Sequence, residues 1–182
     1  MCSGSPFSAI CCVCDCTIQA GDTSDPYLFV ATLGATNYSF VRLYPSMDLK
    51  NWIQAHCVAF EFFGGIPAIV VPDNLKTVVT KPNYYDPDIN PTYADMARHY
   101  GVVVLPARIR KPNDKAKVES AVLHVERKIL AALRDHTFFS IEEANEAIAE
   151  KLEGMNNEPF QKLVYYDLKR PLSRRNKATK TV

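Results

Sequence analysis

The stretch IPAIVVPDN, residues 66–74, decides the fold. Its apolar run 66–71 has the length of one strand and contains no charged residue, which is typical of a central strand buried on both faces. Pro72 ends the run, because proline has no N–H to give to a sheet ladder. Asp73 and Asn74 therefore follow the carboxyl end of a buried strand.

Three strands are expected before this stretch and one after it. The earlier segments are rich in β-compatible apolar residues with turn residues between them, and the later one is a short apolar run. These strands are predicted at 9–18, 27–33, 38–44 and 102–105.

Helical periodicity fills the intervals between these strands. Helices are predicted over 48–63, over 92–100 with Thr92 as cap, from near Asn113 along an apolar stripe that reaches Leu133, and over 141–154. Ser140 and Glu143 form a capping box for the last of them, whereas the proline-rich residues 80–91 are predicted to be loop. The resulting order is that of an RNase H-like α/β fold, a mixed five-stranded sheet with helices on both faces.

Length and charge fit a soluble protein with one principal domain. The 182 residues carry a formal net charge of only +1, and no apolar run is long enough to span a bilayer. We divide the chain into an atypical segment 1–26 that holds the first strand, a core 27–158 and a basic tail 159–182. A second basic cluster precedes and enters the long helix, and both clusters suit phosphate contact. Its members are Arg108, Arg110, Lys111, Lys115 and Lys117.

Acidic residues on three predicted elements suggest metal chemistry. Asp73 follows the buried strand, Glu119 lies on the long helix, and Asp15 interrupts the apolar first strand. An Asp buried in an apolar strand needs a partner, and a metal ion would provide one. Phosphodiester cleavage uses two divalent cations about 3.5–4 Å apart. Carboxylate oxygens suit Mg²⁺ or Mn²⁺.

Each of these residues also has a plain structural interpretation. Asp73 can cap a turn. Glu119 can be the i,i+4 partner of Lys115. Asp15 can belong to an irregular amino-terminal segment, and the neighbouring cysteines are interpreted as reduced, small apolar residues rather than zinc ligands, because a second Cys pair is missing.

Four longer segments resemble the integrase-core, or DDE, transposases, and among these the IstA type. The segments are FVATLGATNYSFVR (29–42), WIQAHCVAFEFFGGIPAIVVPDNLK (52–76), NPTYADMARHYG (90–101) and PARIRKPNDKAKVES (106–120). The resemblance implies a DDE-type polynucleotidyl transferase in which Asp73 is the second acid, Glu119 the third, and Asn74 a support for Asp73. Lys115 and Lys117 would then lie near DNA.

The first acid departs from the family pattern. A cysteine-rich stretch stands where the family shows a Val-Asp-aromatic segment, although Asp15-Cys16-Thr17 resembles the first-acid strand of retroviral integrases. We therefore assign Asp15 as first acid, with Asp22 and Asp25 as fallbacks, and expect a chain truncated at both ends. The resemblance further implies DNA ends and target DNA as partners, a homo-oligomer, a helper ATPase, and a cytoplasmic, nucleoid-associated location.

The expected function is therefore metal-dependent DNA cleavage and strand transfer in transposition. Two alternatives stay open. One is a catalytically incomplete fragment that only binds DNA, and the other is an RNase H-like nuclease that cuts without joining.

Overall fold

The computed structural model describes residues 8–15, 18, 26–34, 36–72, 79–81, 88–105 and 112–158. Within these residues five strands form one sheet in the order β3-β2-β1-β4-β7. β1 pairs antiparallel with β2 and β2 with β3, whereas β1–β4 and β4–β7 are parallel. The sheet is therefore mixed, as predicted. The strands are β1 Ser8–Asp15, β2 Tyr27–Leu33, β3 Ser39–Tyr44, β4 Ile69–Pro72 and β7 Val103–Val104.

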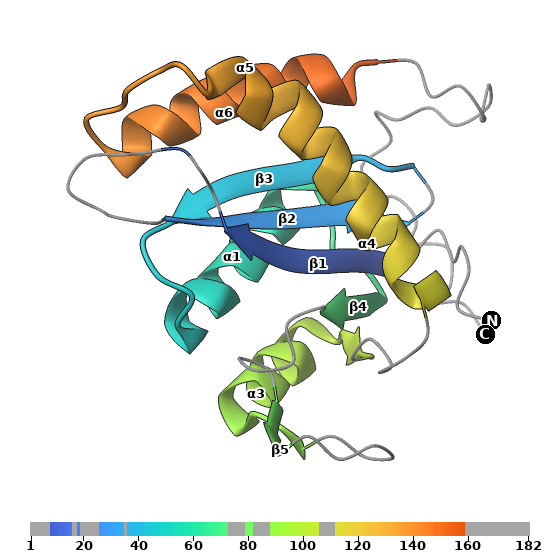
Figure 1. The fold of residues 1–182 in the computed structure, drawn as a ribbon. Coiled ribbons are helices and arrows are strands. Elements are labelled where there is room, and N and C mark those ends of the chain that lie inside the picture. The colour runs from blue at the N-terminus through green and yellow to red at the C-terminus, as the bar shows by residue number, and fades with distance from the viewer. Residues whose placement is uncertain are drawn as a thin grey trace.

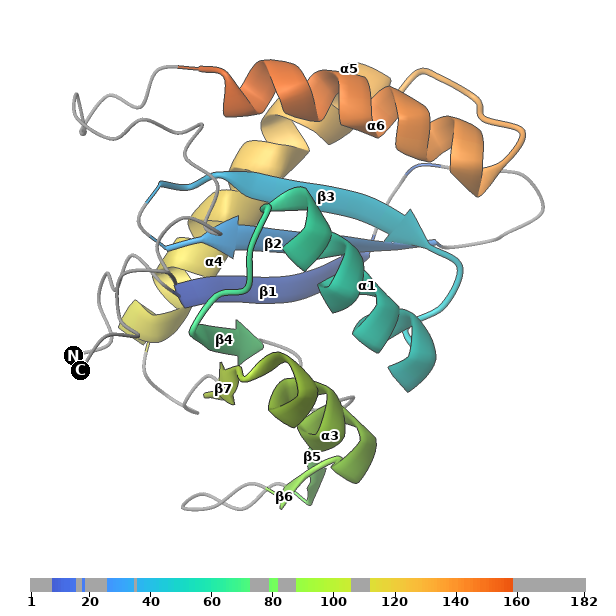
Figure 2. The ribbon, with the colours of Figure 1, turned by 180° about the vertical axis from the view of Figure 1, so that it is seen from behind.

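Helices cover both faces of this sheet (Figure 1). α1 and α3 lie on one face, and the continuous run α4–η1–α5 lies on the other together with α6; the reverse view brings α1 and α3 to the front (Figure 2). Their bounds are α1 Leu49–Phe62, α3 Pro91–Tyr100, α4 Pro112–Val125, η1 Glu126–Leu130, α5 Ala131–Leu133 and α6 Ile141–Asn156.

Strand β2 divides the apolar interior into two cores. Leu28 and Val30 pack with α4–α6, whereas Phe29 and Ala31 pack with α1 and α3, and all four side chains are at most 2% exposed. This split follows from the strand period, which sends successive side chains to opposite faces. Burial on both faces explains why the β2 sequence is apolar almost throughout.

A neutral histidine joins the two helices on the α1 face. His56 of α1 donates from Nδ1 to the Trp52 carbonyl at 2.8 Å, and its Nε2 accepts from the Tyr93 hydroxyl of α3 at 3.2 Å. Complete burial lowers the pKa of His56 to about 4. The ring is therefore uncharged at neutral pH, and both nitrogens are paired.

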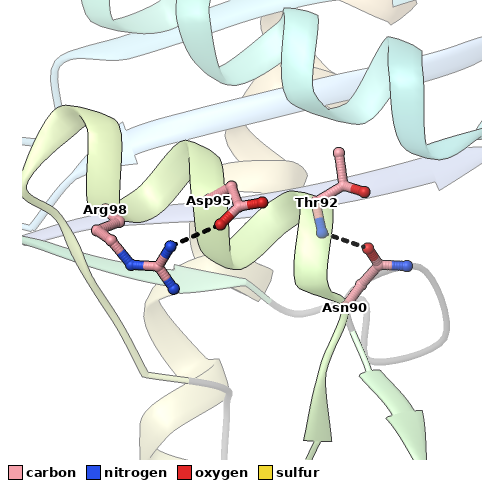
Figure 3. Close-up of polar contacts among 4 residues, drawn as sticks. All are labelled: Asn90, Thr92, Asp95 and Arg98. Atoms are coloured by element: carbon pink, nitrogen blue, oxygen red, sulfur yellow. Dashed lines mark hydrogen bonds and ion pairs between the residues drawn. The ribbon is translucent and has the colours of Figure 1, made fainter.

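Several local features differ from the sequence prediction. β4 covers Ile69–Pro72 rather than 66–71, so Pro72 is its last residue, and Ile66 is exposed before it. α3 begins one residue earlier than predicted, with Asn90 rather than Thr92 as its cap: the Asn90 Oδ1 accepts from the Thr92 amide at 3.0 Å (Figure 3). Two short paired strands occupy part of the predicted loop 80–91: β5 Val79–Lys81 overlaps its start, and β6 Asp88–Ile89 lies within it. The long helix contains one π-helical segment, η1, which brings Ile129 and Leu130 into the same core although they are adjacent in sequence.

The cap of α6 also differs in detail from a capping box. Ser140 accepts from the Glu143 amide at 3.1 Å, as predicted. The Glu143 carboxylate reaches one residue further back and accepts from the Phe139 amide at 2.8 Å, whereas a capping box would use the Ser140 amide. α6 then runs to Asn156, two residues beyond the predicted end.

Two asparagines of α6 hold the helix to the outer strand β3. Asn145 Oδ1 accepts from the Leu43 amide at 2.7 Å and its Nδ2 donates to the Leu43 carbonyl at 3.1 Å; Asn156 makes the same pair of bonds to Ser39 at 3.0 and 2.8 Å. Eleven residues are about three helical turns and about 16 Å, close to the roughly 14 Å between Ser39 and Leu43 along the strand. α6 must therefore run nearly along β3.

Replacing Asn145 by Leu should destabilise the fold. The change removes two hydrogen bonds and leaves the Leu43 amide and carbonyl without their partner, so the free energy of unfolding should fall by about 1–3 kcal/mol. Urea unfolding followed by circular dichroism measures this loss. Glu146→Gln, at an exposed position of the same helix, is the matched control and should change stability by less than about 0.5 kcal/mol. Equal stability of the two variants would contradict the role of Asn145.

His56 should make stability depend on pH. Because its pKa is about 4 in the folded protein and 6.5 ordinarily, the unfolded chain binds the proton first as pH falls. The free energy of unfolding should therefore fall by up to about 3 kcal/mol as the pH is lowered from about 6.5 to about 4. Urea titrations at several pH values should show this dependence of stability on pH in the wild type. His99→Gln is the matched control and should show it too, because His99 is exposed. His56→Gln should lack it, and an unchanged slope in that variant would exclude His56 as the source.

Candidate active site

The candidate site lies where β1 and β4 run side by side. The two strands are parallel, as the prediction of converging acids requires, so their carboxyl ends point the same way. Asp15 is the last residue of β1 and pairs with Tyr27 of β2. Asp73 and Asn74 follow Pro72, the last residue of β4, and both lie outside the described residues.

The register of β1 against β4 shifts the predicted acids along the sheet. The last described pair joins Cys11 to Pro72, and Asp15 lies four residues farther along β1, about 13 Å at the usual rise of a strand. β1 thus extends well past the end of β4. The residue beside the end of β4 is a cysteine, and the distance between the Asp15 and Asp73 carboxylates falls outside the described residues.

Glu119 lies in the second turn of α4, and its side chain is exposed. In both views α4 begins beside the end at which β1 starts and crosses toward β2 and β3 (Figures 1 and 2). The structure brings the elements of the three acids together, because β1 pairs with β4 and α4 packs against β1 and β2.

The predicted DNA-contacting residues border the same helix. Lys115 and Lys117 belong to the first two turns of α4, on the backbone that leads to Glu119. Arg108, Arg110 and Lys111 lie outside the described residues. The two lysines and Glu119 thus fall within one short stretch, 115–119, of the same helix.

The donor atoms of the predicted set suit a hard divalent cation. Asp15, Asp73 and Glu119 all offer carboxylate oxygens, the ligands that Mg²⁺ and Mn²⁺ prefer. Over the parts of the chain that the structure describes, no group of three or more His, Cys, Asp or Glu side chains is close enough to hold a metal. The predicted set is only partly within those parts, because the Asp15 side chain and Asp73 are outside them.

Cys11 and Cys57, the two cysteines whose side chains the structure describes, are free thiols. Cys11 is 1% exposed within the α1-side core, and burial raises its thiol pKa far above the ordinary value. A thiol that stays protonated is neither a nucleophile nor a metal ligand. Cys11 therefore acts as a small apolar core residue, in agreement with the interpretation of the cysteine-rich strand; Cys12, Cys14 and Cys16 have side chains outside the described residues.

Sequence comparison identifies the family. The profile of the integrase core domain matches residues 9–112, more than half of the chain. The chain belongs to the integrase core domain family. The matched range contains β1, β4 and the segment up to the start of α4, so the candidate site lies largely within the family's own domain.

Curated proteins similar to this chain include transposases of insertion sequences. The "Putative transposase for insertion sequence IS408" of Burkholderia multivorans is 46% identical over 145 residues, which cover 80% of this chain and 28% of that protein. The chain spans about a quarter of the length of the curated relatives it matches. The relationship is therefore strong over the integrase core and concerns a minor part of each relative.

Solved integrase structures share the fold. A chain of the simian T-cell lymphotropic virus intasome, solved in complex with a PP2A regulatory subunit, has a TM-score of 0.67 at 10% identity, covering 89% of this chain and 52% of that chain. The HTLV-2 integrase catalytic core domain in complex with magnesium has a TM-score of 0.60 at 13% identity, covering 86% and 90%. These likenesses establish the RNase H-like architecture of retroviral integrase cores for this integrase core domain.

In the described residues no helix is long and apolar enough to cross a membrane.

Sequence reasoning missed one polar feature of this domain. Tyr44 and Trp52 are buried, yet the Tyr44 hydroxyl and the Trp52 indole N–H have no partner within hydrogen-bonding geometry among the described residues. Periodicity cannot reveal this, because it marks a residue as buried without showing where its one polar atom points.

Proposed function

We propose that this integrase core domain is the catalytic core of a DNA transposase of the IstA type, which cleaves DNA at a transposon end and joins it to a target. The observation that carries the proposal is the parallel β1–β4 pair with α4 across it, in a chain whose named relatives are transposases. That arrangement presents acidic positions from two strands and one helix. The IstA assignment rests on the four sequence segments described above.

In this proposal Asp15, Asp73 and Glu119 hold the divalent metal ions. Bound Mg²⁺ or Mn²⁺ supplies activation of the attacking oxygen and stabilisation of the leaving oxygen. The three side chains fix the ions by oxygen ligation, and Asn74 orients the Asp73 carboxylate. Glu119 suits this part because its exposed carboxylate is accessible from solvent on the α4 side.

The basic residues would bind the DNA backbone. Lys115 and Lys117 lie about one helical turn or less from Glu119 on α4 and would bring phosphates to the metal ions. Arg108, Arg110 and Lys111 would extend this contact before the helix, and the segment 159–182 would add non-specific phosphate contact. The domain division at residues 26 and 158 belongs to the same proposal.

The assembly proposed for this core follows its relatives. We infer a homo-oligomer acting on transposon ends and target DNA, with a helper ATPase, in the cytoplasm at the nucleoid. The solved neighbours include an intasome and a dimeric integrase core. Recognition of a particular end sequence would need residues beyond those that match the integrase core domain.

One observation favours a second candidate, a catalytically incomplete core that binds DNA without cutting it. Pro72, which precedes Asp73, pairs with Cys11, and Asp15 lies four residues beyond that pair. If Asp15 does not reach the metal ions, the site retains two acids and a buried thiol. The same two-acid site would also disqualify the chain as a nuclease.

Metal titration separates these two functions. Calorimetric titration of Mn²⁺ into the protein should show binding that Asp73→Asn and Glu119→Gln each weaken by at least about tenfold, since loss of even an outer-shell partner commonly costs 10–100-fold. Asp15→Asn should weaken it as much if the triad is complete. Glu126→Gln, exposed farther along the same helix run, is the matched control and should bind like the wild type.

The Asp15 variant decides the outcome. Unchanged Mn²⁺ affinity in Asp15→Asn, with losses in the other two, would establish the incomplete core. Unchanged affinity in all three would reject the metal site as a whole. Strand-transfer products from a matching DNA end would distinguish a transposase from a nuclease.

Salt dependence tests the lysines of α4. Each phosphate contact releases counterions, so the slope of log K for duplex DNA against log salt should become shallower by about 1 for Lys115→Ala and again for Lys117→Ala. Fluorescence anisotropy at several salt concentrations measures the slope. Lys151→Ala on α6, on the far helix of this face, should leave it unchanged; an equal change in all three variants would contradict a local DNA-binding surface.

A further inference from the structure

The outer side of α6 is a helix face that no other described element covers. In both views α6 lies along the margin of the molecule (Figures 1 and 2). The buried residues of the helix are Ala144, Ile148, Leu152 and Met155. The opposite side is acidic, with the exposed residues Glu142, Glu146, Glu150 and Glu153. Their intervals of four, four and three residues place them on one side of the helix, which we call the acidic face of α6.

The described residues do not neutralise this face. Glu150 pairs there only with its neighbour Lys151, at 3.4 Å, and both side chains are exposed. Glu142, Glu146 and Glu153 take part in none of the ion pairs between described residues. Like charges four residues apart on a helix repel each other and lower its stability. Binding of cationic side chains would therefore relieve repulsion as well as add attraction.

An exposed aromatic residue precedes the amino end of the acidic face. The Phe139 side chain is 86% exposed, although the neighbouring Phe138 is buried in the core. The Phe139 amide donates to the Glu143 carboxylate at 2.8 Å, which fixes the backbone on which the exposed ring stands. Aromatic residues are enriched in protein interfaces and often contribute much of the binding energy. A partner for this surface therefore needs apolar side chains as well as cations.

Residues 159–182, which follow α6 directly, have this complementary chemistry. They contain seven Lys or Arg and one Asp, together with the apolar and aromatic stretch LVYY at 163–166. Residues 141–158 contain six Glu and one Lys. The formal net charge of the whole chain is only +1, so two adjacent stretches of the chain hold opposite charges that nearly cancel.

The basic segment is long enough to reach the whole acidic face. It starts at the carboxyl end of α6, where Glu158 pairs with Lys128 of η1 at 2.7 Å. The 16 residues of α6 span about 24 Å, whereas the 24 residues of 159–182 reach up to roughly 80 Å when extended. A segment tethered so closely has an effective concentration on the order of millimolar, so weak contacts suffice to hold it.

We propose that residues 159–182 dock on the acidic face of α6 of the same chain, with their basic side chains beside the glutamates and their apolar residues beside Phe139. The cations of this segment are also those proposed above to contact DNA phosphates. The acidic face of α6 is therefore an internal competitor, which phosphates must displace before the segment binds DNA. This consequence rests on the proposed function, whereas the docking itself does not.

Limited trypsin digestion of the full chain measures the docking without DNA or metal. Trypsin cleaves after Lys and Arg, and cleavage within 159–182 follows the fraction of molecules in which the segment is undocked. The combined variant Glu142→Gln, Glu146→Gln and Glu153→Gln should be cleaved there at least about threefold faster than the wild type at low salt. At about 1 M salt the two rates should become equal, because exposed charges are then screened beyond roughly 3 Å. Intact-mass spectrometry follows each cleavage.

Matched variants separate docking from a general effect of charge. Glu61→Gln, Asp95→Asn and Glu126→Gln together remove the same three negative charges at exposed positions on other helices, and this control should be cleaved like the wild type. Phe139→Ser should be cleaved about twofold faster than the wild type. Phe62→Ser, which removes an exposed aromatic ring from α1, should not. Thermal unfolding of each variant establishes that it is folded.

Three outcomes would overturn the proposal. The first is an equal cleavage rate in the wild type and in the glutamine variant of α6. The second is an equal acceleration in the control that carries its changes on other helices. The third is a wild-type rate that falls as the protein concentration rises, because the segment then docks on a second copy of the chain. None of these outcomes depends on metal binding or strand transfer, so failure of the docking and failure of the proposed function are distinguishable.

Discussion

The covering of β2 on both faces is the constraint on which the rest of this domain depends. A strand that carries large apolar side chains on both faces must have a layer on each, and α1 with α3 supplies one while α4–α6 supplies the other. Because β1 lies between β2 and β4, the same two layers also hold the parallel β1–β4 pair on which the candidate site depends. The position of the candidate site thus follows from the arrangement of the layers.

Much of this arrangement could be predicted because it depends on the local periodicity of apolar residues. The apolar run before Asp73 and the helical spacing from Asp48 to Phe63 each depend on neighbours in sequence. The structure has α1 over almost the whole predicted helix, and β4 over Ile69–Pro72, the second half of the predicted strand and the proline after it. The His56–Tyr93 contact joins residues 37 apart, and the π-helical segment η1 depends on how α4 meets the sheet. Such features result from tertiary packing, for which a single sequence carries no periodic signal.

The acids show where prediction from spacing stops. Asp73 and Glu119 were predicted as acids from the end of a strand and from a position on a helix. Whether Asp15 can lie near Asp73 depends on the register of β1 against β4. Where a strand is apolar on both faces, a shift in its register against a parallel neighbour still places apolar side chains on both faces. The apolar pattern therefore does not specify the register. Cys11 opposite Pro72 could therefore not be foreseen, and it is the observation that most divides a complete integrase core from an incomplete one.

The two asparagines of α6 have a consequence for how this sheet can associate. An outer strand normally offers unpaired amides and carbonyls to any other strand, which is how sheets grow into larger assemblies. On β3 the carboxamides of Asn145 and Asn156 already occupy such groups of Leu43 and Ser39, imitating a neighbouring strand with side chains. Strand addition beyond β3 is therefore blocked at Ser39 and Leu43, by side chains of a helix rather than by another strand.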